Sequence, residues 1–340
     1  MRAARLAALA CLSLAPLPSF AADEALIAAA RKEGRAVWYT TQIVNQLAQP
    51  ISDAFAKRYG VTVSPIRSDT SEIILRITNE ARAGRLQADV FDGTATVPAL
   101  KRAGLVAHWQ PDIARSWPKH LVDAEGYWVA TNIYVHTPIY NTQLISRGRE
   151  PRVWDDLLNP SLKDKIAISG LVSSSSGPGF VGAVLDDLGE ERGLSFLKKL
   201  SGQNVHNVNS AARSVVDQAM AGEYAIVLQA FNHHAVISAA QGAPVDWIKW
   251  SPALSVLSIA AVTKDAPHPN AARLFVDFMT SPDGQRFFAA ADYLPADPAI
   301  PAKTPELKPD AGGFRAITLT PEQLDGSLPK WSDIYKSIFR

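Results

Sequence analysis

Cysteine is almost absent from this sequence: the 340 residues contain one, Cys11. A disulfide framework or a cysteine-rich zinc site needs several cysteines, so both are excluded. An excess of one charge is also lacking, because 34 Lys and Arg residues stand against 33 Asp and Glu residues. Near-neutrality argues against nucleic-acid binding, which needs a basic stripe. The composition of 47% hydrophobic and 20% charged residues excludes a disordered chain.

Long hydrophobic runs are lacking too. The longest apolar stretch, residues 6–17, is shorter than the roughly 20 residues that a membrane-spanning helix needs. Arg2 and Arg5 precede this stretch, and Ser19 and Ala21 follow it at the −3 and −1 positions of a cleavage site. The pattern predicts a signal peptide over residues 1–21 and a periplasmic protein. Cleavage would also remove the cysteine, which suits an oxidising compartment.

Helical and strand-like segments alternate along the remainder of the chain. Residues 36–39, 61–63 and 88–91 read as buried strands, and the segments between them have helical spacing. The alternation predicts an α/β fold with a mostly parallel sheet. Because chains beyond roughly 250–300 residues usually divide their core, we expect two domains.

Four polar segments follow predicted strands: residues 40–42, 67–70, 173–179 and 209–213. In open α/β sheets, ligands bind beyond the carboxyl ends of the strands, where helix N-termini present free N–H groups. These segments therefore predict an anion site. Trp38, Tyr39 and Phe231 could add an apolar or stacking wall.

Two arginines in these segments have alternative roles. Arg213 lies in the first turn of a predicted helix, where the macrodipole disfavours a cation. It could meet a bound carboxylate or phosphate, or it could pair with Asp217 four residues later. Arg67 could likewise contact the ligand, or it could be a solvated surface residue.

The sequence favours neither a metal site nor an enzyme. His233 and His234 are adjacent and would point about 100° apart on a helix, so we expect a surface or capping role for them. No G-x-S-x-G elbow, Walker loop or G-x-G-x-x-G motif stands in the right context. We expect no cofactor and no catalysis; a secreted hydrolase is the alternative of a different class.

Short motifs in a fixed order carry a resemblance to a known family. They are ADVF at 88–91, IYNT at 139–142, PRVWDDLL at 151–158, APHPNAA at 266–272 and SPDGQ at 281–285. With these motifs the chain resembles periplasmic solute-binding proteins of ABC importers, in the cluster that binds ferric iron, thiamine or phosphonates. The order of motifs holds across nearly the whole chain.

The resemblance implies a type II periplasmic binding fold, in which two α/β lobes joined by hinge strands close on a ligand. Each lobe is a mostly parallel sheet flanked by helices. The hinge strands are expected near residues 128–135 and 254–262. The implied division is lobe 1 at 22–127 plus 256–295, lobe 2 at 128–255, and a C-terminal irregular segment and helix at 296–340.

The resemblance also implies the function: capture of a small anionic solute by a monomer that delivers it to an inner-membrane ABC permease. Ferric-binding relatives have a tyrosine pair where this chain has Phe231 and Asn232. Without this pair, ferric ion is only the alternative ligand, held with a synergistic anion through Tyr39, His233 or His234. The relatives' anion loop matches Ser175–Gly177. The candidate ligand contacts are Tyr39, Thr41, Arg67, Ser68, Thr70, Thr94, Ser175, Ser176, Gly177, Asn209, Ser210, Arg213, Gln229, Phe231 and Asn232.

Overall fold

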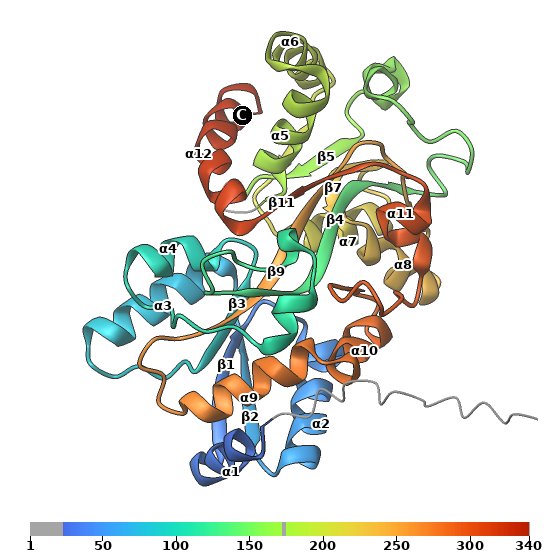
Figure 1. The fold of residues 1–340 in the computed structure, drawn as a ribbon. Coiled ribbons are helices and arrows are strands. Elements are labelled where there is room, and N and C mark those ends of the chain that lie inside the picture. Colours follow the sequence, from blue (N-terminus) through green and yellow to red (C-terminus); the bar gives the residue numbers. More distant parts are fainter. Residues whose placement is uncertain (1–22, 172–174, 340) are drawn as a thin grey trace, which may run out of the picture.

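The computed structural model describes residues 23–171 and 175–339, and Figure 1 shows two bodies joined by long strands. Within these residues, eleven strands form one sheet whose main path runs β2-β1-β3-β9-β4-β7-β5-β6. The predicted signal peptide lies outside the described residues. None of the helices in the described ranges has the length and hydrophobicity needed to cross a bilayer.

One end of the sheet belongs to what we call the first lobe. Its strands β2 (Thr62–Arg67), β1 (Arg35–Thr40) and β3 (Val90–Gly93) are parallel. Their alternation with helices is the pattern that the sequence predicts. The helices of this lobe are α1 (Glu24–Glu33), α2 (Gln49–Tyr59), α3 (Thr70–Arg82), α4 (Thr96–Arg102), α9 (Pro269–Thr280) and α10 (Pro282–Ala290).

The other end belongs to the second lobe. Its strands β7 (Ile226–Phe231), β5 (Ile166–Ser169) and β6 (His206–Val208) are again parallel. Both lobes thus have the parallel sheet that we expect of them. The helices of this lobe are α5 (Gly177–Leu188), α6 (Glu190–Ser201), α7 (Ala212–Met220) and α8 (Asn232–Ala240).

Strands β4 (Val129–Asn141) and β9 (Ala253–Val262) connect the lobes. They pair with each other antiparallel, and they also pair antiparallel with β7 and β3, respectively. The centre of the sheet is therefore antiparallel, unlike its two ends. The expected hinge segments, 128–135 and 254–262, overlap these strands; the residue boundaries of the lobes stay a prediction.

Short elements complete the sheet and one side of the molecule. Strands β8 (Val245–Trp247) and β10 (Leu294–Pro295) pair with β4, and β11 (Ala316–Leu319) pairs with β9. After the short helix α11 (Pro309–Gly312), helix α12 (Pro321–Ile338) begins at a capping box. Helix α12 packs against α5 and also touches α4, so it contacts both lobes (Figure 1).

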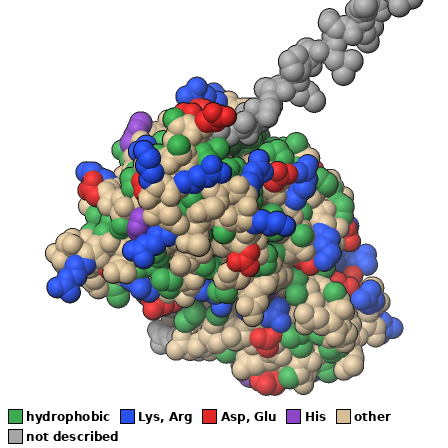
Figure 2. Space-filling model, turned by 90° about the horizontal axis from the view of Figure 1, so that it is seen from below, with side chains coloured by type: hydrophobic (Ala, Val, Ile, Leu, Met, Phe, Trp, Pro, Cys, Tyr) green, Lys and Arg blue, Asp and Glu red, His purple; other side chains and the backbone are tan. Residues whose placement is uncertain are grey.

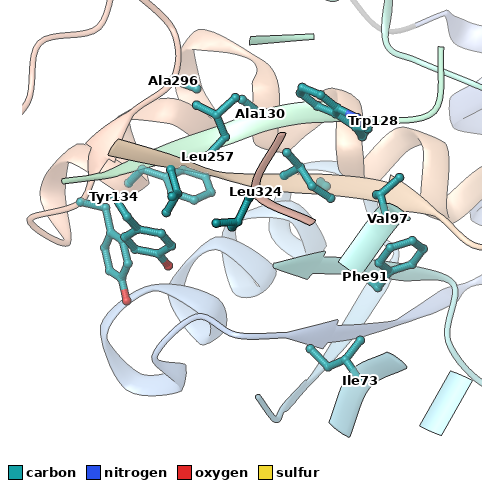
Figure 3. Close-up of a cluster of buried hydrophobic side chains, with 14 of the residues drawn as sticks. Ile73, Phe91, Val97, Trp128, Ala130, Tyr134, Leu257, Ala296 and Leu324 are labelled. Atoms are coloured by element: carbon teal, nitrogen blue, oxygen red, sulfur yellow. The ribbon is translucent and has the colours of Figure 1, made fainter. Parts of the chain in front are cut away.

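One large hydrophobic cluster runs through both lobes and includes α12. Phe91 and Trp128 near one end, Leu257 on β9 and Leu324 on α12 all belong to it (Figure 3). On the surface, Lys and Arg residues alternate with acidic and uncharged ones over the face that Figure 2 shows. This mixture agrees with the near-zero net charge of the sequence.

The contact between α12 and α5 leaves no space for an added methyl group. A Cβ built on Gly182 would lie 2.5 Å from the Trp331 ring, whereas a Cβ on Gly326 meets nothing within 4 Å. We expect Gly182→Ala to lower the free energy of unfolding by about 1–3 kcal/mol through overpacking. Gly326→Ala, the matched control, should be neutral or stabilising by up to about 1 kcal/mol. Urea unfolding measures both, and equal effects would contradict the tight α12–α5 contact.

Candidate functional site

A cavity of about 460 Å³ is lined by residues of both lobes. The first lobe contributes the segments that follow β1, β2 and β3. The second lobe contributes the segments that follow β5, β6 and β7, and α12 adds two leucines. The lining residues are Thr41, Ile43, Arg67, Ser68, Asp69, Thr70, Ser71, Thr94, Ala95, Tyr134, Leu171, Ser175, Ser176, Ala211, Ala212, Arg213, Phe231, His233, His234, Tyr293, Leu324 and Leu328.

Four helices of nine residues or more begin at this cavity. The residues that precede them, Asp69 before α3, Ser176 before α5, Ala211 before α7 and Phe231 before α8, all line it. The first N–H groups of a helix have no partner within the helix, and the macrodipole adds partial positive charge there. Helix starts from both lobes therefore make the cavity electropositive through the backbone.

Arginine side chains add full charges to this field. Arg67 and Arg213 line the cavity, against one acidic side chain, Asp69. The Nε of Arg213 donates to Oδ1 of Asp217 at 3.0 Å, and 37% of the Arg213 side chain remains exposed. The two roles open for Arg213 are thus compatible in geometry: it pairs with Asp217 and also borders the cavity. Arg67 is exposed and borders the cavity as well.

The adjacent histidines lie inside the molecule, so the surface role expected of them is wrong. His233 is 1% exposed and His234 is 7% exposed, and both line the cavity. They occupy the first turn of α8, which follows β7 of the second lobe, and the His233 ring lies 5.0 Å from the Tyr293 ring, between centroids. The His233 ring also packs against Phe231 and Tyr134, at centroid distances of 5.5 and 5.7 Å.

These histidines are neutral at neutral pH. Burial, with a smaller contribution from Arg213, lowers the pKa of His233 to about 3, and it lowers the pKa of His234 well below 6.5. Burial lowers the pKa of His136 on β4 to about 3 as well. The Nε2 of His136 lies 3.3 Å from Oγ of Ser175. The histidines therefore offer hydrogen bonds to an occupant and no charge.

A buried aspartate positions Thr41. Both the N–H and the hydroxyl of Thr41 donate to Oδ1 of Asp92 at 2.7 Å, and the hydroxyl of Thr40 donates to Oδ2. Burial raises the pKa of Asp92 to about 6, although these hydrogen bonds act in the opposite direction. Asp92 lies in β3, directly after the ADVF motif, and this position is the sequence signal that could have revealed it.

A polar network lies beneath the cavity, at the crossing of the central strands. The side-chain amide of Gln42 donates to Oδ1 of Asn132 and to Oγ of Ser258, each at 3.1 Å. The hydroxyl of Tyr134 donates to Oε1 of Gln42 at 3.0 Å. The network links the end of β1 to both β4 and β9. Burial also raises the pKa of Tyr134 well above 10 and that of Tyr293 to about 12.

The cavity brings together most of the residues that the sequence nominates. Those that line it are Thr41, Arg67, Ser68, Thr70, Thr94, Ser175, Ser176, Arg213 and Phe231. Those that do not line it are Tyr39, Gly177, Asn209, Ser210, Gln229 and Asn232.

Three of the residues outside the cavity form hydrogen bonds elsewhere. The hydroxyl of Tyr39 donates to Oε1 of Glu80 at 2.5 Å, so this hydroxyl is engaged outside the cavity. The amide of Asn232 donates to the Leu307 carbonyl at 2.9 Å. The carbonyl of Ser210 accepts the Ser169 hydroxyl.

The sequence reading missed several residues of the cavity wall. Tyr134 and Tyr293 lie on β4 and near β10, and no local motif marks either of them. Leu324 and Leu328 belong to α12, which the sequence predicts only as a final helix. The other missed residues are Ile43, Ser71, Ala95 and Leu171, whereas Asp69, Ala211 and Ala212 lie within the predicted polar segments 67–70 and 209–213.

The chain belongs to the family of bacterial extracellular solute-binding proteins, whose pattern matches residues 87–312. Among curated proteins, an uncharacterised protein of Haemophilus influenzae is 26% identical over 277 residues, which is 78% of each chain. The match places the chain among solute-binding proteins of the ABC importer family, which are not enzymes.

Solved structures show the same fold. Iron-bound HitA from Pseudomonas aeruginosa superposes with a TM-score of 0.73 at 22% identity, over 89% of this chain and 99% of its own. AfuA from Actinobacillus pleuropneumoniae, with fructose-6-phosphate bound, gives 0.74 at 22% identity over 89% and 99%. The periplasmic binding protein P5PA gives 0.75 at 23% identity over 90% and 100%. The two-lobed α/β fold expected from the sequence is confirmed.

The buried histidines predict how stability depends on pH. The ordinary histidine pKa is 6.5 and the folded value of His233 is about 3, so the unfolded chain binds more protons between these values. The free energy of unfolding therefore falls as the pH falls from 6.5, by at most about 1.4 kcal/mol per pH unit for each such histidine. Asp92 and Asp277, with raised pKa values of about 6 and 7, act in the opposite direction.

A pair of variants isolates the contribution of one histidine. Between pH 6.5 and 4.5, the free energy of unfolding of His233→Gln should fall by about 1–3 kcal/mol less than that of the parent protein. His206→Gln, at an exposed histidine outside the cavity, is the matched control. Urea unfolding at several pH values gives both slopes. Identical slopes for His233→Gln and the parent would refute the neutral, buried state of His233.

Proposed function

We propose that this protein captures a small anionic solute between its two lobes and delivers it to an ABC permease of the inner membrane. The head group is a phosphonate, a phosphate ester or a carboxylate. The observation that carries this proposal is the convergence of four helix N-termini and two arginines on one cavity. Helix starts bind anions through free N–H groups.

The cavity wall offers the head group contacts from both sides. On the second lobe, the start of α5 with Ser175 and Ser176 and the guanidinium of Arg213 are available. On the first lobe, Thr41 and Arg67 lie on the same cavity. A ligand that touches both lobes binds the closed form more tightly and shifts the population towards it. The permease would then recognise the closed form.

The proposal includes a location and a working state. We assign the protein to the periplasm as a monomer that binds no nucleic acid. The predicted signal peptide and the extracellular description of the family support the location. The mixed surface charges support the absence of nucleic acid as a partner.

Removing one arginine tests the anion site. Arg213→Ala should weaken binding of methylphosphonate or glycerol 3-phosphate about 5- to 150-fold, because a hydrogen bond to a charged group is worth about 1–3 kcal/mol. Arg192→Ala, which removes an exposed arginine of α6, is the matched control and should bind like the parent. Isothermal titration calorimetry gives the affinities. If phosphonates, phosphate esters and carboxylates all fail to bind or to raise the melting temperature, the proposal is wrong; turnover of a probe would favour a hydrolase.

Ferric ion is the alternative cargo, and one observation favours it. Tyr134 and Tyr293, with ring centroids 6.0 Å apart, line the cavity together with His233. Tyr39, the tyrosine named for this role, does not line it. Because burial raises the pKa of both cavity phenols, we expect them to stay protonated and iron-treated protein to show no visible tyrosinate band. A strong band that Tyr293→Phe abolishes would overturn the anion-only proposal.

A further inference from the structure

One part of the cavity wall is apolar and comes from α12. Leu324 and Leu328 stand four residues apart on this helix, so they share one face, and both line the cavity. Leu171 extends this apolar wall from the segment after β5. Leu324 is 1% exposed and belongs to the cluster shown in Figure 3, while Leu328 is half-buried.

Helix α12 is fixed at both ends. On the side of the first lobe, Arg102 pairs with Asp325 at 2.6 Å, and Nε1 of Trp128 donates to Glu322 at 2.8 Å. These contacts hold the first turns of the helix, which carry Leu324.

The second half of α12 is held by the second lobe. Lys330 pairs with Glu190 at 2.9 Å, and the hydroxyl of Tyr335 donates to Asn207 at 2.9 Å. The two leucines thus lie between anchors on both lobes. They are a fixed part of the wall, not side chains of a free helix.

The size of the cavity points to a ligand with more than a head group. A volume of about 460 Å³ falls in the range of roughly 300–1,000 Å³ that suits organic ligands and far exceeds a single phosphate or metal ion. Hydroxyl groups of a sugar or polyol would face the side chains of Leu171, Leu324 and Leu328, which cannot form hydrogen bonds with them. Leaving a polar group unpaired on burial is unfavourable. An apolar body meets no such penalty.

We propose that the solute is an anion with an apolar body, such as an alkyl or aryl phosphonate or carboxylate, and that Leu324 and Leu328 select it. This inference rests on the proposed anion-binding function and adds the chemical class of the remainder of the ligand. The helix starts and arginines bind the head group, and α12 contacts the body. The apolar body gains affinity in proportion to the area that it buries.

A homologous series of probes tests the inference. We expect the affinity for methyl-, propyl- and pentylphosphonate, measured by calorimetry, to rise about fourfold for each added methylene. Glycerol 3-phosphate, of similar length but polar, should bind more weakly than pentylphosphonate. Leu328→Asn, at a half-buried site that leaves the core intact, should reduce the gain in affinity for each added methylene. It should also raise the affinity for glycerol 3-phosphate relative to that for pentylphosphonate. Leu144→Asn changes a leucine that is 52% exposed outside the cavity and should keep the parent's series.

The outcomes separate the two proposals. If all phosphonates bind equally, or glycerol 3-phosphate binds best, the apolar body is refuted and the anion site stands. If the parent shows the series but Leu328→Asn retains it unchanged, the selecting role of α12 is refuted. If neither the phosphonates nor glycerol 3-phosphate bind, the proposed function fails and this inference fails with it.

Discussion

The antiparallel pairing of β4 with β9 is the constraint on which the remainder of the structure depends. All ten residues of β9 are buried, so its backbone groups must find partners within the sheet. The Gln42 amide network adds side-chain bonds at the same crossing and joins β1 to both strands. Buried polar groups of this kind are costly to leave unpaired, so any movement of the lobes has to preserve the crossing. The joint therefore fixes which edges of the two lobes face each other.

This geometry makes the electrostatics of the cavity a property of the backbone. Each lobe has a parallel sheet, and the helices that follow parallel strands all begin at the same edge. Because the joint turns these edges towards one cavity, helix starts from two sheets act on the same volume. Only two arginines are needed in addition, and one of them is already paired with Asp217. A chain with a net charge of +1 can thus hold an electropositive cavity without a cluster of lysines.

Sequence patterns predict local features well, and the cavity includes features that are not local. Strand ends followed by polar residues identify Thr41, Ser68 and Ser175 because the chemistry and the element boundary coincide there. His233 misleads because a helical pattern cannot tell that the first turn of α8 lies beneath the opposite lobe. Tyr134 lies within a strand whose residues are nearly all buried, so no periodicity marks it. The antiparallel centre of the sheet is also invisible to the alternation of helices and strands, since it arises from chain crossings far apart in sequence.

The position of α12 determines when, during folding, the binding cavity becomes complete. Residues 321–338 complete a wall whose other members begin at residue 41. Contacts of such large sequence separation form late, because the intervening chain must first be ordered. Each lobe can gather its parallel strands and their helices before this, but the cavity gains its last side only when α12 docks on both of them. The cavity therefore lacks one side until α12 has docked on both lobes, and we expect this docking late in folding.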